Sequence, residues 1–206
     1  IDVTLRTARY DGASRRETVD GVSISRGGGR HTVYIRAGLA MVAARLGLGP
    51  LRHVRPDVVI DSQNGLPFLA RLAFGRRVVV LVHHCHRDQW PVAGRFLGRF
   101  GWFVESRLSP RLHRRNQYVT VSLPSVRDLT DLGVDAGRVA VVRNGLDEAP
   151  PQTLDDERSP TPRAVVLSRL VPHKQIEDAL DAVAVLRTRV PDLHLDVVGG
   201  GWWQDR

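Results

Sequence analysis

The sequence predicts an α/β protein whose main domain is a Rossmann-like, doubly wound parallel sheet. Three observations predict this class. Short β-rich runs alternate with stretches of helical composition over residues 1–147. Residues 78–82 are five consecutive aliphatics, as expected for a strand that is covered on both faces of its sheet. A proline-rich segment then precedes another strand–helix–strand pattern, which predicts a second, incomplete Rossmann-like domain.

The elements follow from local patterns in order along the chain. Strands are expected at residues 3–7, 21–25, 57–61, 77–82, 118–122 and 138–142. Helices are expected at residues 32–48, 66–74 and 92–107, the last broken near Pro110. Gly75 is expected to end the second helix. Ser125 and Asp128 resemble a capping box for a further helix, and Gly133 is expected to end it.

Residues 148–163 contain four prolines among acidic and small polar residues, which indicates a linker between domains. Beyond it we expect a strand at 164–167, a helix at 174–190 and a strand at 193–198, the start of a C-terminal domain over residues 164–206. The apolar residues that would face this sheet are Ile176, Leu180, Val183 and Leu186. About forty residues rarely close a core alone, so we expect a piece of a longer protein.

The composition of the 206 residues, 42% hydrophobic and 25% charged, is that of a folded protein. Cys85 is the single cysteine, which excludes a disulfide framework and fits a reducing compartment, so a cytoplasmic protein is expected. The net charge of +8 comes from scattered arginines, with Lys174 as the sole lysine. Because no basic block appears, nucleic-acid binding is not expected.

Polar residues follow several expected strands, where open parallel sheets bind ligands. Four such positions are candidates for lining a cleft: Asn64, His83, Ser122 and Asn144. Ser122 is better explained as a helix cap, and Asn144 with the next glycine as a turn. The run from His83 to His86 contains three histidines, but no metal is expected there, because adjacent side chains of an extended chain point in opposite directions. His83 could bind sugar hydroxyls or support a developing charge, or its ring could be satisfied by loop carbonyls.

Arg169 follows the first strand of the second domain, and Lys174 is expected to open the helix after it. Two cations beside a helix N-terminus suit a diphosphate, although a solvated helix start would look the same. The glycines at positions 199–201 follow the next strand. They permit close backbone approach to a phosphate, or form a simple turn.

These segments together resemble the family four glycosyltransferases, which have the GT-B fold. The resemblance rests on residues 168–174, on the strand ending at Gly199-Gly200-Gly201, and on Asn144-Gly145-Leu146-Asp147. Residues 56–61, 80–83 and 119–133 fit the same family in the same order, so that the resemblance covers nearly the whole chain. Ser168 stands where the family has glycine.

The resemblance implies a retaining enzyme that transfers a sugar from a nucleotide-sugar donor to a glycan, lipid or small-molecule acceptor, without an obligatory metal. It implies that Arg169 and Lys174 hold the donor diphosphate. His83 would be the catalytic residue, which contacts the transferred sugar or helps to stabilise the transition state, and Gly199 and Gly201 would line the donor pocket. A lipid acceptor would bring the protein to the inner face of the membrane.

The family's first strand with its glycine-rich loop, and its late Glu-x7-Glu segment, do not occur in the sequence, so impaired activity is expected. The alternatives are an inactive binding module on the same fold, a sugar-nucleotide epimerase, and a basic nucleic-acid binder.

Overall fold

The computed structural model describes residues 1–29, 32–148 and 159–204. The chain forms two compact units, Ile1–Gly145 and Leu146–Arg206. Most of the expected 148–163 linker lies outside the described residues. No helix in the described ranges is both long enough and apolar enough to cross a membrane.

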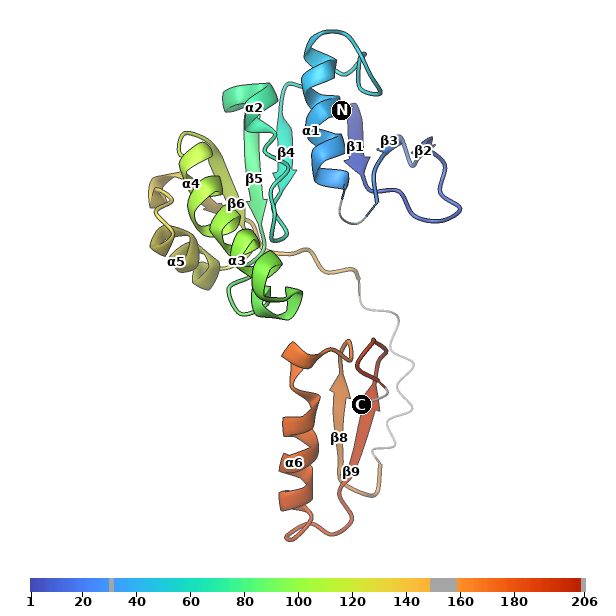
Figure 1. Ribbon diagram of the computed structural model, residues 1–206. Helices are drawn as coiled ribbons and strands as arrows, with labels where there is room; N and C mark the ends of the chain where they lie inside the picture. Colours follow the sequence, from blue (N-terminus) through green and yellow to red (C-terminus); the bar gives the residue numbers. More distant parts are fainter. Residues whose placement is uncertain (30–31, 149–158, 205–206) are drawn as a thin grey trace. The chain divides into compact units, whose positions relative to one another are not determined.

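The first unit begins with a three-stranded sheet of its own (Figure 1). Its strands are β1 (Val3–Thr7), β2 (Arg16–Val19) and β3 (Val22–Arg26), in the order β1-β3-β2. β1 runs parallel to β3, and β2 pairs antiparallel with β3. β2 was not predicted from the sequence, although Asp20 and Gly21 mark its hairpin turn. Both have positive φ, 49° and 79°, as a two-residue hairpin turn requires.

The predicted parallel sheet is confirmed. Its four strands are β4 (Val59–Ser62), β5 (Val78–Val82), β6 (Gln117–Thr120) and β7 (Val139–Val141), hydrogen-bonded in that order and all parallel. Burial along β5 alternates: Val78, Val80 and Val82 are fully buried, whereas Val79 and Leu81 are only partly covered. One face of this strand is therefore packed more closely than the other, and full cover of both faces was an overestimate.

The helices of the first unit are α1 (Val33–Arg45), α2 (Arg71–Phe74), α3 (Arg95–Phe103), α4 (Ser109–Leu112) and α5 (Leu123–Asp131). Short 3₁₀ segments lie at Gly75–Arg77, Trp90–Ala93 and Ala136–Arg138. Gly75, with φ of 62°, and Gly133, with φ of 88°, end α2 and α5 as predicted. α2 is shorter than predicted because Leu69 takes a left-handed conformation just before it.

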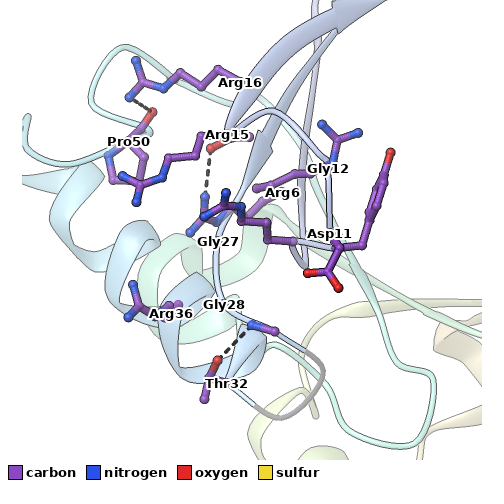
Figure 2. Close-up of a pocket in the computed structure, with 15 residues that line it drawn as sticks. Arg6, Asp11, Gly12, Arg15, Arg16, Gly27, Gly28, Thr32, Arg36 and Pro50 are labelled. Carbon is purple, nitrogen blue, oxygen red and sulfur yellow. Dashed lines mark hydrogen bonds between the residues drawn. The ribbon is translucent and has the colours of Figure 1, made fainter.

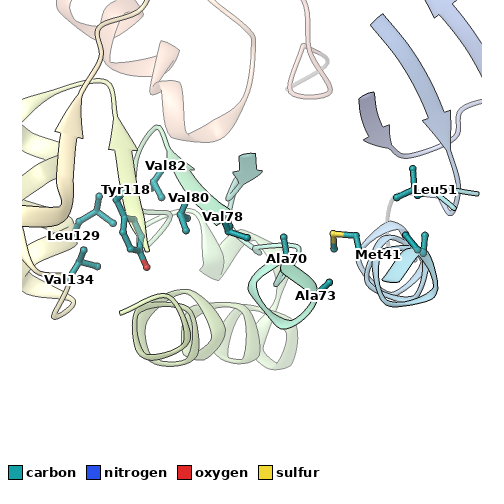
Figure 3. Close-up of a cluster of buried hydrophobic side chains, with 12 residues drawn as sticks. Met41, Leu51, Ala70, Ala73, Val78, Val80, Val82, Tyr118, Leu129 and Val134 are labelled. Carbon is teal, nitrogen blue, oxygen red and sulfur yellow. The ribbon is translucent and has the colours of Figure 1, made fainter. Parts of the chain in front are cut away.

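The core of the first unit joins small residues of two helices to the centre of the sheet (Figure 3). α1 buries Ala37, Ala40, Met41 and Ala44, at the spacing of one helix face. α2 contributes Ala70 at its N-cap and Ala73, and the buried valines of β5 continue the cluster to Tyr118, Leu129 and Val134. The alanines allow α1 and α2 to approach closely.

The helix that was expected to break near Pro110 continues through it. A π turn at Val104–Leu108 links α3 to α4, and the helix ends at Leu112. Proline lacks an N–H, and its ring clashes with the carbonyl four residues earlier in a regular helix. The wider π turn removes that conflict, since its hydrogen bonds span five residues.

The N-terminus of α5 shows which serine caps the helix. Ser122 is the N-cap, and its Oγ accepts a hydrogen bond from the backbone N of Ser125 at 3.3 Å. Capping by Ser122 is confirmed, and the capping box placed at Ser125 and Asp128 is wrong. Ser125 is buried, and its hydroxyl instead donates to the carbonyl O of His83 at 2.9 Å.

The second unit contains β8 (Arg163–Leu167), a 3₁₀ turn (Pro172–Lys174), α6 (Ile176–Leu186) and β9 (His194–Val198). β8 and β9 pair in parallel with α6 beside them (Figure 1), which confirms the predicted strand–helix–strand unit. Ile176 and Val183 of α6 are partly covered, but Leu180 and Leu186 remain 52% and 48% exposed. The predicted apolar stripe is thus only half covered by this two-stranded sheet.

Candidate functional site

A polar cluster occupies the carboxyl ends of β4 and β5 in the first unit. Its centre is His86, in the loop after β5. The His86 Nε2 lies 2.9 Å from the Oδ1 of Asn64, which follows β4, and its Nδ1 lies 3.2 Å from the Oε1 of Glu105. Which ring nitrogen carries the proton depends on the tautomer, and each nitrogen faces one polar partner. The ring is therefore held in one orientation at the sheet edge.

The Glu105 carboxylate holds the loop after β5 in place through hydrogen bonds. The side chain is fully buried on the π turn and accepts from the backbone N of His86 at 3.1 Å. Its other oxygen accepts from the indole Nε1 of Trp90 at 2.6 Å. Both donors belong to the loop that carries the histidines, so a single buried carboxylate fixes the loop after β5.

Trp90 lies against a flat helix surface made by two glycines. A Cβ at Gly101 would collide with the indole ring, and a Cβ at Gly98 would collide with the Trp90 carbonyl O. Both glycines are buried on α3. Because neither has a side chain, the indole can reach Glu105, and the loop packs directly onto the helix.

The other members of the histidine run have different environments. The His84 ring lies against that of His86, tilted by 32° and with 4.2 Å between the ring centroids. Burial lowers the pKa of His84, and the nearby His86 adds to the effect. Burial raises the pKa of the Cys85 thiol to about 12, so this cysteine behaves as a packing residue. In the residues that the structure describes, no three His, Cys, Asp or Glu side chains are grouped so that they could hold a metal ion.

A second polar layer, made of buried side chains, adjoins this cluster. Asp61 at the end of β4 is buried and accepts from the backbone N of Phe68 and of Ala70, at 2.8 and 2.9 Å. The Ser109 hydroxyl donates to Gln63 Oε1 at 2.6 Å, and the Nδ1 of His113 lies 3.0 Å from the Ser109 carbonyl O. His113 Nε2 is 3.9 Å from Asp61 Oδ2 and makes no hydrogen bond within the described residues. This layer fixes the loop after β4, which carries Asn64.

His113 makes stability depend on pH. Burial lowers its pKa below the value of about 6.5 of an unfolded histidine, although Asp61 opposes the shift. The unfolded chain then binds a proton that the folded chain does not. Stability is therefore complete above about pH 6.5 and falls as the pH is lowered. We expect urea unfolding at pH 5.5 to show a larger loss, relative to pH 7.5, in the wild type than in His113→Gln.

The loss at pH 5.5 is at most about 1.4 kcal/mol, because this pH lies about one unit below the pKa of an unfolded histidine. His53→Gln, at an exposed position of the same unit, is the control and should keep the wild-type pH dependence. An unchanged pH dependence in His113→Gln would show that His113 is not the responsible group. His84 contributes in the same direction, so part of the dependence should persist in that variant.

The four predicted cleft positions have different surroundings in the structure. Asn64 joins the His86 cluster. Ser122 is linked to the end of β5 through Ser125 and the carbonyl of His83. His83 is exposed and contributes this backbone oxygen, whereas Asn144 lies exposed beyond β7. His83 was the residue predicted from the histidine run, but His86 is the histidine whose ring is held in place, and the roles of Glu105 and Trp90 were not predicted. The repeat of polar residues at 105, 109 and 113 in a helical stretch was the available signal.

The predicted donor residues of the second unit lie on two loops that pair closely. The backbone N of Ser168 donates to the Val198 O, and that of Leu170 to the Gly200 O, both at 3.1 Å. A Cβ at Gly199 would collide with the Ser168 carbonyl O, and one at Gly201 with the Leu170 carbonyl O. Both glycines therefore have a packing role in holding the loop of Arg169 against the loop after β9.

Arg169 and Lys174 are both exposed on this side of the unit. Lys174 ends the 3₁₀ turn and does not open the helix, since α6 begins at Ile176 after Gln175 in a left-handed conformation. The first turn of α6 carries Glu177 and Asp178, which already neutralise its dipole. An anion here would rely on the two cations rather than on the helix end.

The arrangement offers exposed imidazole and amide groups on a fixed sheet edge in one unit, and two exposed cations beside a tight glycine loop in the other. A model described as Glycosyltransferase Family 4 matches residues 1–150. The chain belongs to glycosyltransferase family 4. Its parallel sheet is consistent with the Rossmann-like domain of the GT-B fold expected for this family.

A named relative gives a finer comparison. The chain is 34% identical over 137 residues to a GDP-mannose-dependent alpha-(1-6)-phosphatidylinositol monomannoside mannosyltransferase of Mycolicibacterium smegmatis. The match covers 65% of this chain and 35% of the relative. The matched part of the chain thus spans about a third of the length of that relative.

Proposed function

We propose that this chain belongs to a retaining glycosyltransferase that takes its sugar from a nucleotide sugar. The family match over residues 1–150 carries this proposal. GDP-mannose is the first donor to test, and a glycolipid with a phosphoinositol headgroup the first acceptor, because the relative is named for both. With such an acceptor the enzyme would work at the inner face of the membrane.

The chemistry requires stabilisation of two charges. The departing nucleoside diphosphate gains negative charge, which Arg169 and Lys174 would neutralise without a metal. The sugar passes through an oxocarbenium-like state, in which hydrogen bonds to its hydroxyls hold the ring. His83, as the resemblance implies, or the fixed ring of His86 would supply such a contact. The buried Glu105 supports the second option, because it keeps the His86 ring oriented.

The donor site is tested by calorimetry with GDP. We expect Arg169→Ala and Lys174→Ala each to weaken GDP binding about tenfold or more, because each removes charge-assisted hydrogen bonds worth about 1.5–3 kcal/mol. Arg189→Ala is the matched control, since Arg189 is an exposed arginine just beyond α6 in the same unit. Equal affinity in all three variants would refute the donor-site assignment.

Product analysis separates the proposed transferase from its alternatives. Transfer with retention predicts a product whose anomeric carbon keeps the configuration of the donor, which NMR of the anomeric proton measures. GDP binding without transfer would instead indicate an inactive binding module. Conversion of the free nucleotide sugar to an isomer would indicate an epimerase.

A further inference from the structure

The first unit contains a basic hollow far along the chain from the histidine cluster. Its volume is about 990 Å³, and it lies between the three-stranded sheet and the N-terminal half of α1 (Figure 2). Six arginines line it: Arg6, Arg9, Arg15, Arg16, Arg26 and Arg36. We refer to it as the arginine hollow. Its size is at the upper end of the range for small-molecule sites, larger than a bare ion needs.

The positive charge of the arginine hollow is largely uncompensated. Asp11 also lines it. Of the six arginines, Arg26 alone forms an ion pair within the described residues, with Glu17 at 2.5 Å. The side chains of Arg9, Arg15 and Arg36 make no hydrogen bond or ion pair within the same residues and are exposed. These guanidinium groups keep all their donors available to a ligand.

Arg6 is a residue of the arginine hollow whose side chain is held in place by its neighbours. Its Nη1 donates to Ser25 Oγ at 2.9 Å, and its Nε is buried without a hydrogen-bond partner in the described part of the chain. A Cβ at Gly27 would collide with the Arg6 guanidinium, so the glycine leaves the space that this group occupies. Burial lowers the pKa of Arg6, and the charges of Arg36 and Arg16 lower it further. A bound anion would relieve this repulsion.

The N-terminus of α1 adds to the positive electrostatic potential of the arginine hollow. Its N-cap, Thr32, makes no capping hydrogen bond, because the Thr32 hydroxyl accepts from the backbone N of Gly29 at 3.0 Å. The first turn of α1 carries no acidic residue. Side chains of the first turn therefore do not neutralise the positive end of the helix dipole. This helix end lies at the edge of the arginine hollow, because Thr32 and Arg36 both line it.

We propose that the arginine hollow binds the phosphate groups of a ligand about the size of a phosphorylated sugar. A guanidinium group can donate two parallel hydrogen bonds to a pair of phosphate oxygens. Several such groups line the arginine hollow. The ligand is either a soluble phosphate ester or the headgroup of a phospholipid, which share this chemistry. The site belongs entirely to the first unit and does not depend on the donor assignment of Arg169 and Lys174.

Calorimetry with inorganic pyrophosphate tests this in the Arg169→Ala, Lys174→Ala background, which removes the proposed donor cations. We expect the added pair Arg15→Gln and Arg36→Gln to weaken binding about tenfold or more. Neither side chain has an intramolecular partner in the described residues, so folding should be unaffected. Arg76→Gln, at an exposed arginine of the same unit outside the hollow, should leave the affinity within about twofold.

A second variant tests whether the position of the Arg6 guanidinium matters for binding. Gly27→Ala should displace the Arg6 guanidinium and weaken pyrophosphate binding while the protein stays folded, because the displaced group is the end of a flexible side chain. The proposal is wrong if wild type and variants bind pyrophosphate equally, or if Arg76→Gln weakens binding as much as the pair does.

Vesicles distinguish the two sources of phosphate. Cosedimentation with phosphatidylcholine vesicles that contain phosphatidylglycerol, lost in the Arg15→Gln, Arg36→Gln pair and reversed by pyrophosphate, would support a lipid headgroup. Pyrophosphate binding without cosedimentation would support a soluble phosphate ester. Absence of both interactions would overturn the proposal.

Discussion

Glu105→Ala is expected to destabilise the first unit by about 3 kcal/mol and to release the loop after β5. The buried carboxylate accepts from the Trp90 indole, the His86 backbone and the His86 ring, and its removal leaves these donors without their partner. Each buried donor left unsatisfied costs about 1–3 kcal/mol, offset in part by water entering the space. Chemical unfolding followed by tryptophan fluorescence measures the loss.

Two further variants show whether this effect belongs to Glu105. Glu105→Gln keeps the shape and one acceptor oxygen, so its loss of stability should be smaller than that of the alanine variant. Asp131→Asn removes an exposed acid at the end of α5 and should leave stability unchanged. If Glu105→Ala unfolds at the wild-type denaturant concentration, the carboxylate does not hold the loop.

Gly199→Ala is expected to separate the two loops of the second unit. Gly199 has a φ of 154°, which favours glycine, and a Cβ would collide with the backbone carbonyl of Ser168, which has no flexible end to move. Strain of this kind costs about 1–3 kcal/mol before the clash is added. We expect both a loss of stability and a loss of GDP binding, because the loop that carries Arg169 moves.

Gly200→Ala is the matched control for this prediction. Its Cβ would meet nothing within 4 Å, so it should keep the stability and GDP affinity of the wild type. Circular dichroism during thermal unfolding and calorimetry with GDP measure the two properties. Wild-type behaviour of Gly199→Ala in both would show that the loops do not need their close approach.

The parallel sheet could be predicted because its strands are local runs of β-branched residues. The hairpin of β2 was missed although Asp20-Gly21 is its signal, because Arg16–Val19 has mixed polarity. Gly75 and Gly133 were correct as helix ends, since a left-handed glycine acts locally. The predicted break near Pro110 was wrong, because a π turn that accommodates a proline depends on the packing around the helix.

The candidate site was only partly predictable. The histidine run was visible, but the choice among its members depends on Glu105, 19 residues away from His86 along the chain. No spacing rule links the two, because the sheet topology brings them together. The arginines looked like an even background in the sequence, yet three strands, one helix and the loop between β1 and β2 bring six of them around one hollow.

The π turn at Val104–Leu108 also sets the rotational phase of the helix that contains it. Residues four apart in a regular α-helix drift around the axis by about 40°, so Glu105, Ser109 and His113 would turn progressively away from a common side. The wider turn takes more residues per revolution and offsets part of that drift. One helix can then serve two strand ends: Glu105 holds the loop after β5, while Ser109 contacts Gln63 beyond β4.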